Sequence, residues 1–210
     1  MAYRKFKLAE LEAKFGIQNR LIDWLDLSTI VQITPSSFLT TAIKKANLAP
    51  LSTEKALSER VISPIMAEIF ELNIGTIQLF SGEIINADES NGLNGEIDFL
   101  FNFRPYSATP ETPIFSITES KIGMLNKAWA QAGAQMLGVS ILNQQQNHPL
   151  EVVFGAVTDG NGWQFMKLEN NIIHIHPTVV PLAHLPLILG VFQYFIDVYK
   201  NSYPSVLRFK

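Results

Sequence analysis

The sequence predicts an α/β fold in which helices flank a mixed β-sheet. Residues 53–72 repeat apolar side chains at helical spacing, and segments 95–103 and 113–121 are rich in β-forming residues. Residues 151–168 have the composition of two short strands joined by a tight turn. Helices and strands thus alternate along the chain, which is the pattern of a layered α/β domain.

Composition narrows the functional classes. The chain has 210 residues, of which 47% are hydrophobic, so it is long and apolar enough to build one sizeable core. Its formal net charge is −3, whereas proteins that coat nucleic acid are usually basic because phosphate neutralisation drives their binding. An enzyme that uses carboxylates to bind metal stays possible. The absence of cysteine excludes disulfides, thiolate zinc sites and iron–sulfur clusters.

Neither end of the chain predicts a membrane segment. Residues 1–12 are charged and lack the apolar block of a signal peptide. The longest apolar stretch, residues 179–198, contains five interrupting residues: Pro181, His184, Pro186, Gly190 and Gln193. We therefore expect no membrane partner and a cytoplasmic location.

The first fifty residues are expected to form a helical N-terminal extension to a main domain at residues 51–210. Residues 5–14 carry scattered apolar side chains among charged ones. Residues 35–46 begin with Pro35, which suits the first turn of a helix because its missing N–H would have no partner there.

A longer helix is predicted at residues 53–72. Ser52 or Thr53 can cap it, because a hydroxyl oxygen accepts a hydrogen bond from a free backbone N–H of the first turn. Its apolar stripe consists of Leu57, Val61, Ile65, Ile69 and Leu72. Pro64 predicts a kink or a break, because proline removes a helical hydrogen bond.

The remaining elements follow from local patterns. Strands are predicted at 77–80, 95–103 and 113–121, and a helix at 126–143. Two further strands, at 152–157 and 163–168, surround the turn sequence Asp-Gly-Asn-Gly. A strand at 172–175 and an apolar helix at 182–199 complete the chain.

Three residues form the most informative constellation. Asp98 lies inside an apolar strand, where a carboxylate is costly to bury unless it is paired or binds a metal. Glu119 and Lys121 are two positions apart on the next strand, so both leave the same face. If the strands are neighbours, the two carboxylates can hold Mg²⁺ or Mn²⁺, and the Ser120 carbonyl can be a further ligand. An exposed hairpin with a weak Glu–Lys surface pair produces the same pattern.

The chain also resembles the PD-(D/E)XK, or restriction-endonuclease-like, superfamily. The segments that carry the resemblance are GEIDFL at 95–100, FSITESK at 115–121 and QAGAQM at 131–136. Shorter stretches extend it over residues 51–197, and it resembles in particular an uncharacterised cyanobacterial-type group. The proline that usually precedes the first acid is absent, since Ile97 stands there.

This resemblance implies a restriction-endonuclease-like mixed sheet and assigns metal binding and hydrolysis to Asp98, Glu119 and Lys121. A glutamate from the preceding helix often joins the metal, and the two candidates here are Glu59 and then Glu68. They are nine residues apart, so they face different sides of a helix.

A glutamine from the helix that follows the two strands often lines the site in this superfamily. Gln131 fits best, and Gln135 lies one turn further on the same side.

We expect a Mg²⁺- or Mn²⁺-dependent nuclease that hydrolyses phosphodiester bonds in DNA. The alternatives are a non-catalytic nucleic-acid-binding or protein-binding member of the same fold, and a scaffold whose acids form only a structural ion-pair network. A homodimer is also expected, because the final helix and the N-terminal section offer more apolar surface than one small sheet needs.

Overall fold

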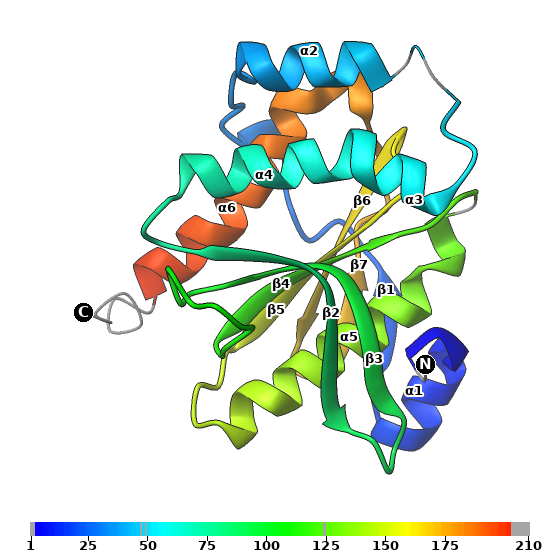
Figure 1. The fold of residues 1–210 in the computed structure, drawn as a ribbon. Coiled ribbons are helices and arrows are strands. Elements are labelled where there is room, and N and C mark those ends of the chain that lie inside the picture. The colour runs from blue at the N-terminus through cyan, green and yellow to red at the C-terminus, as the bar shows by residue number, and fades with distance from the viewer. Residues whose placement is uncertain (1–2, 47, 49, 124, 203–210) are drawn as a thin grey trace.

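A mixed β-sheet organises the chain (Figure 1). The structure, a computed structural model, describes residues 3–46, 48, 50–123 and 125–202. Within them the sheet has eight strands in the order β1-β7-β6-β5-β4-β3-β2, and β8 pairs with β6. The strands are β1 Gln18–Leu21, β2 Gln78–Asp88, β3 Leu93–Asn102, β4 Ile114–Ser120, β5 Val152–Thr158, β6 Gly162–Glu169, β7 Ile172–Ile175 and β8 Val180–Pro181.

The centre of the sheet matches the sequence prediction. The four strands expected to share one sheet, β3 to β6, are consecutive neighbours. β3 runs antiparallel to β4, β4 parallel to β5, and β5 antiparallel to β6. The parallel pair is joined through helix α5, Trp129–Gln145, because parallel strands need a crossover connection. The predicted α/β class, with helices flanking a mixed sheet, is confirmed.

The N-terminal section differs from its prediction. It contains the expected helices, α1 Leu8–Phe15 and α2 Ser37–Ala46. However, it also contributes β1, a strand that the sequence did not predict, which pairs in parallel with β7 at the sheet edge. β1 has the sequence QNRL and is exposed along its whole length. It shows no alternation of apolar and polar residues, so only its backbone pairing makes it a strand.

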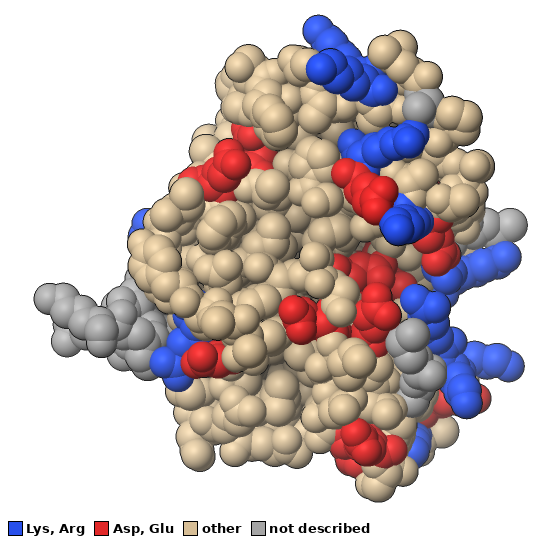
Figure 2. All heavy atoms as spheres, in the orientation of Figure 1, with Lys and Arg blue, Asp and Glu red and all other residues tan. Residues whose placement is uncertain are grey.

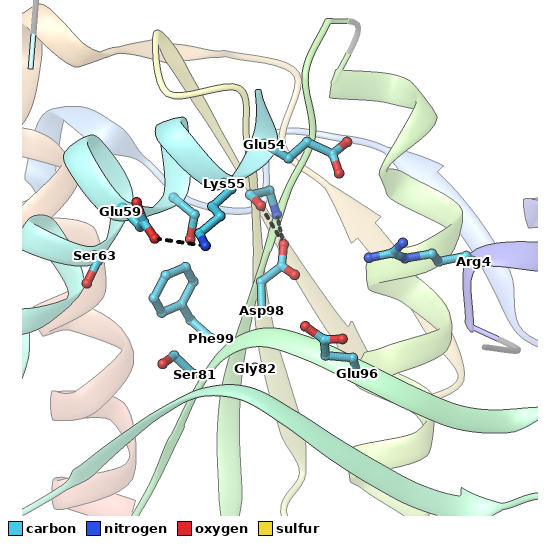
Figure 3. Close-up of a pocket in the computed structure, with 12 residues that line it drawn as sticks. Arg4, Glu54, Lys55, Glu59, Ser63, Ser81, Gly82, Glu96, Asp98 and Phe99 are labelled. Carbon is cyan, nitrogen blue, oxygen red and sulfur yellow. Dashed lines mark hydrogen bonds and ion pairs between the residues drawn. The ribbon is translucent and has the colours of Figure 1, made fainter. Parts of the chain in front are cut away.

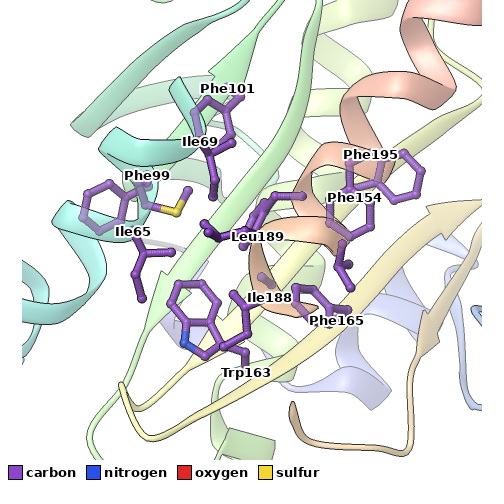
Figure 4. Packing of buried hydrophobic residues seen from close by; sticks show 14 of the residues in the cluster. Ile65, Ile69, Phe99, Phe101, Phe154, Trp163, Phe165, Ile188, Leu189 and Phe195 are labelled. Atoms are coloured by element: carbon purple, nitrogen blue, oxygen red, sulfur yellow. The ribbon is translucent and has the colours of Figure 1, made fainter. Parts of the chain in front are cut away.

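Helices cover both faces of the sheet. Helices α4 (Ser63–Leu72) and α6 (Leu185–Ser202) pack on one face, with α2 beside them, and α5 and α1 lie on the other (Figure 1). The first of two hydrophobic cores lies between the sheet and α4 and α6. Figure 4 shows its aromatic centre, where the rings of Phe154 and Phe195 stack with their centroids 4.1 Å apart. The second core lies under α5 and includes Ile117 and Val157.

The predicted helix at 53–72 forms as one helical run of three parts: α3 Glu54–Leu57, a π-helical turn at Ser58–Ile62, and α4. Thr53 caps it through a hydrogen bond from the Ala56 N–H to its hydroxyl. The irregularity predicted from Pro64 is the π turn directly before it, where the Ser63 N–H bonds to the Ser58 carbonyl. Isolated π turns often occur at functional sites.

The final helix is a core element. Residues 182–200 are long and apolar enough to cross a membrane by composition, with a mean hydropathy of 1.4, but half of this window is buried inside the fold. Leu189, Phe192 and Phe195 are fully buried against the sheet. Its apolar side chains are therefore used within one chain, which removes one reason for expecting a homodimer.

Candidate functional site

The pairing of β3 with β4 brings the predicted acids together. Phe99 pairs with Thr118, so Asp98 and Glu119 are the next residues on the two adjacent strands. Ser120 holds Asp98 in place: its N–H and its hydroxyl both donate to Asp98 Oδ2, at 2.7 and 2.5 Å. The carboxylate is therefore fixed through one oxygen, and Oδ1 accepts no hydrogen bond from the described residues.

Glycine occupies position 82 of β2, beside Asp98 in β3. β2 pairs with β3 on both sides of this position, at Ser81–Phe99 and Glu83–Ile97. Gly82 itself has a φ of +70°, a conformation that residues with a side chain rarely adopt. A Cβ atom at this position would lie 3.8 Å from Glu96 Oε1, and Gly82, Glu96 and Asp98 line the same pocket.

Glu119 is the most perturbed carboxyl group of the cluster. Only 1% of its surface is exposed. Burial, and then the negative charge of Asp98, raise its pKa to about 8, although a hydrogen bond from Gln135 Nε2 to Glu119 Oε2 at 2.8 Å acts in the opposite direction. Arg4 and Lys121 lower the pKa less. Burial and the neighbouring Asp98 thus favour the protonated form of Glu119 near neutral pH.

Lys121 lies at the rim of the cluster. Its backbone N–H donates to the Thr158 carbonyl at 2.8 Å, which extends the β4–β5 ladder by one residue. Its ammonium group lies 3.0 Å from a carboxylate oxygen of Glu54, at the start of α3. Lys121 is thus close enough to act on Glu119 electrostatically, but its ion pair is with Glu54.

A polar pocket of about 500 Å³ surrounds Asp98. Figure 3 shows Arg4 on one side of the Asp98 side chain and Lys55 on the other, with Glu59 beyond Lys55 and Glu96 below. In Figure 2, acidic side chains gather in the centre of this face, and basic side chains lie along one side of them. The pocket therefore combines an acidic floor with basic groups at its edges.

The two candidate glutamates of the preceding helix have different locations. Glu59 lines the pocket and pairs with Lys55 at 3.7 Å, with both side chains largely exposed. Glu68 is buried beside α2, where it accepts hydrogen bonds from the Ser36 N–H and hydroxyl, each at 2.6 Å. The structure thus brings Glu59 to the site and gives Glu68 a structural role.

The glutamine that reaches the site is Gln135, the one placed second from the sequence. Gln131 is buried, and among the described residues it makes no hydrogen bond to Asp98 or Glu119. The side-chain amide N–H of Gln135 donates a hydrogen bond to Glu119. The buried amide oxygen of Gln135 has no hydrogen-bond partner in the described part of the chain.

Sequence reasoning missed Arg4 and Glu96 as site residues. Glu96 lies two residues before Asp98 in an alternating strand, and this spacing was a usable signal. Arg4 belongs to the 3₁₀ turn Tyr3–Lys5 at the N-terminus. No local pattern connects this turn with the strands, so nothing in the sequence indicated its position.

The residues fit a divalent ion with few protein ligands. Across the described ranges, no three Asp, Glu or His side chains converge in a way that could hold a metal. Two carboxylates remain, Asp98 and Glu119, each with one oxygen that accepts no hydrogen bond from those residues. Mg²⁺ is commonly bound by one or two carboxylates, with water and substrate phosphate as its other ligands.

Comparison with known proteins adds no assignment. No protein-family model matches the chain, and a search of curated proteins finds no match.

Proposed function

We propose that this protein is a metal-dependent nuclease of restriction-endonuclease-like fold that hydrolyses phosphodiester bonds in DNA. Asp98 and Glu119 hold Mg²⁺ or Mn²⁺ in this proposal, and Lys121 assists hydrolysis. The observation that carries it is the buried Glu119 carboxyl group next to Asp98, with a pKa raised to about 8. Such a pair is costly to bury without a cation, and a perturbed carboxyl group beside a pocket can mark a functional site.

A bound divalent ion resolves the charge imbalance. It favours the ionised form of Glu119, because the negative charge then faces a cation at short distance. The ion would polarise a phosphoryl oxygen and lower the pKa of a bound water.

The chain's own residues supply orientation and charge. Ser120 fixes Asp98 and Gln135 fixes Glu119, so both carboxylates are held before any ligand arrives. Lys121 can stabilise negative charge that develops on the phosphate. Its ion pair with Glu54 is partly exposed, and such pairs contribute only about 0–1 kcal/mol, so releasing the lysine costs little.

The charge distribution of the pocket suits DNA as substrate and partner. Its floor is acidic and its edges are basic, and Ser58, Ser63 and Ser81 add hydroxyl groups to its walls. A phosphodiester polymer can place one phosphate at a metal ion and its neighbouring phosphates at the basic groups.

The direct test combines Mn²⁺ titration by calorimetry with cleavage assays on plasmid, linear and single-stranded DNA. The wild type should bind Mn²⁺ and cleave, whereas Asp98→Asn should lose both because one carboxylate seldom holds the ion. Glu71→Gln changes an exposed carboxylate of α4 outside the pocket, so this control should behave as wild type.

Two results would contradict the proposal in different ways. A wild type that binds no Mn²⁺ removes both the metal site and the nuclease. Mn²⁺ binding without cleavage of any DNA favours a protein of the same fold that uses this site for recognition.

A further inference from the structure

Arg4 places an unpaired cation at the edge of the acidic pocket. Its side chain is exposed and extends from the N-terminal turn toward Glu96 and Asp98 (Figure 3). No carboxylate among the described residues lies within 4.0 Å of its guanidinium group, in contrast to Lys55 and Lys121, which each have an acidic partner. Arg4 is therefore the pocket cation that is free to bind an anion.

The backbone at Arg4 is held in a defined position by its neighbour Tyr3. Only 1% of Tyr3 is exposed, and its hydroxyl donates to the Ile85 carbonyl in β2 at 3.1 Å. Its ring lies against Gly138 of α5, where a Cβ atom would overlap the Tyr3 hydroxyl. The N-terminal turn is thus fitted between β2 and α5, and Arg4 is part of the pocket wall.

The chemistry of this wall suits a phosphate. A guanidinium group offers five N–H donors in a planar fork that matches phosphate oxygens, and it stays charged at every relevant pH. Lys55 stands on the other side of Asp98 (Figure 3). Cations on both sides of an acidic centre match an extended polyanion whose middle phosphate lies at that centre.

We propose that Arg4 binds a phosphate of the polynucleotide next to the phosphate at Asp98 and Glu119. This inference rests on the proposed function of the site and extends it to substrate binding. In the competing interpretation, Arg4 only offsets the negative charge of the carboxyl cluster. The two differ because a phosphate contact changes the salt dependence of DNA binding, whereas charge compensation changes the affinity for metal.

The experiment compares Arg4→Gln with Lys5→Gln. Lys5 belongs to the same turn and is also exposed, but it lines a different hollow beside α1, so this variant controls for net charge. Binding of fluorescein-labelled single- and double-stranded DNA is measured by anisotropy over a range of NaCl concentrations, with Ca²⁺ in place of Mn²⁺. Mn²⁺ affinity and cleavage are measured separately.

Arg4→Gln should weaken DNA binding about equally for all sequences and reduce the slope of log K against log salt by about 1, because one phosphate contact is lost. Its Mn²⁺ affinity should change much less than its DNA affinity. Lys5→Gln should leave the slope unchanged.

The proposal is wrong if Arg4→Gln keeps the DNA affinity and the salt slope of the wild type, or if only its Mn²⁺ affinity changes. It is also wrong if Lys5→Gln weakens DNA binding and lowers the slope as much as Arg4→Gln does, or if the wild type binds no DNA. The nuclease proposal is judged separately. DNA binding that depends on Arg4 but leads to no cleavage supports Arg4 and contradicts the nuclease. Cleavage that is unaffected by Arg4→Gln contradicts only the role of Arg4.

Discussion

At the scale of single residues, the site depends on how two carboxyl groups share a small space. Asp98 receives two hydrogen bonds from Ser120, which hold its carboxylate in place. Glu119 is more deeply buried and has Asp98 beside it, so its charged form is disfavoured. A proton or a metal ion can settle this imbalance, and the two compete for the same group.

The first prediction concerns pH. In metal-free protein, burial raises the pKa of Glu119 from 4.5 to about 8, so the folded state binds this proton more tightly than the unfolded state. The resulting stabilisation is complete below pH 4.5 and is lost as the pH rises through about 8. With a chelator present, the melting temperature should fall over this window in the wild type and less in Glu119→Gln. Identical pH profiles for the two proteins would mean that Glu119 titrates normally.

The second prediction concerns Lys121. Lys121→Ala should slow cleavage by roughly 10²-fold, the scale found when one group that stabilises developing negative charge is removed. Mn²⁺ affinity should change little, because an ammonium group is no metal ligand. Lys200→Ala, on the exposed side of α6, is the matched control. A Lys121→Ala variant with the wild-type cleavage rate would mean that Lys121 has no role in cleavage and only forms its ion pair with Glu54.

At the scale of secondary structure, the helical run at 54–72 has one end at the site and the other in the scaffold. Its π turn holds Glu59 at the pocket, and Glu68 lies further along in α4. Glu68 is 5% exposed and receives both hydrogen bonds that Ser36 can donate at the start of α2. The Ser36 hydroxyl in turn accepts from the Leu39 N–H. This link fixes α2 to α4.

The third prediction tests that link. Glu68→Gln should destabilise the protein by about 1.5–3 kcal/mol, the range for hydrogen bonds to a charged group, because an amide cannot accept both bonds in the same way. Urea denaturation measures the loss, with Glu71→Gln as the control. Mn²⁺ binding by the folded variant should be unchanged. A loss of Mn²⁺ affinity would instead indicate that Glu68 takes part in the metal site.

At the scale of the whole molecule, the sheet separates two cores that serve different purposes. The first core, between the sheet and α4 and α6, is rich in aromatic side chains. The second core lies beneath α5 and ends at the Glu119–Gln135 hydrogen bond. The site thus lies where an apolar core meets an open pocket, which explains how one carboxyl group can be buried while its neighbour lines the pocket.

The fourth prediction concerns assembly. A homodimer was expected partly because α6 is apolar, but the buried side chains of α6 are used against the sheet of the same chain. The homodimer stays a prediction that now rests on less apolar surface. Light scattering at high protein concentration should report twice the mass of one chain, and the mass of a single chain would contradict it.

Local signals predicted much of the fold. Thr53 caps the helix as expected, and the turn after β5 forms through Asp159, whose carboxylate accepts from the N–H groups of Asn161 and Gly162. The four central strands share one sheet, as their composition predicted. In each case the information lies within a few neighbouring residues, because caps, tight turns and alternation are short-range features.

The choice between Gln131 and Gln135 could not be made in this way. Both lie on the same side of α5, and the one that meets Glu119 depends on how far the helix is shifted along the sheet. Close contacts at glycines accompany this position of the helix: a Cβ atom at Gly138 would overlap Tyr3, and one at Gly133 would overlap Ile173. Such contacts join segments that are distant in the chain, so no periodicity reports them.

The sequence by itself therefore determined the α/β class, the central strands and the candidate trio Asp98, Glu119 and Lys121. Only the tertiary structure decided that β1 joins the sheet, that Glu68 belongs to the scaffold and that Arg4 reaches the pocket. The physical reason is the range of the forces involved. Propensity and periodicity act over a few residues, whereas strand order, helix position and the charge around a buried carboxyl group arise from packing between distant segments.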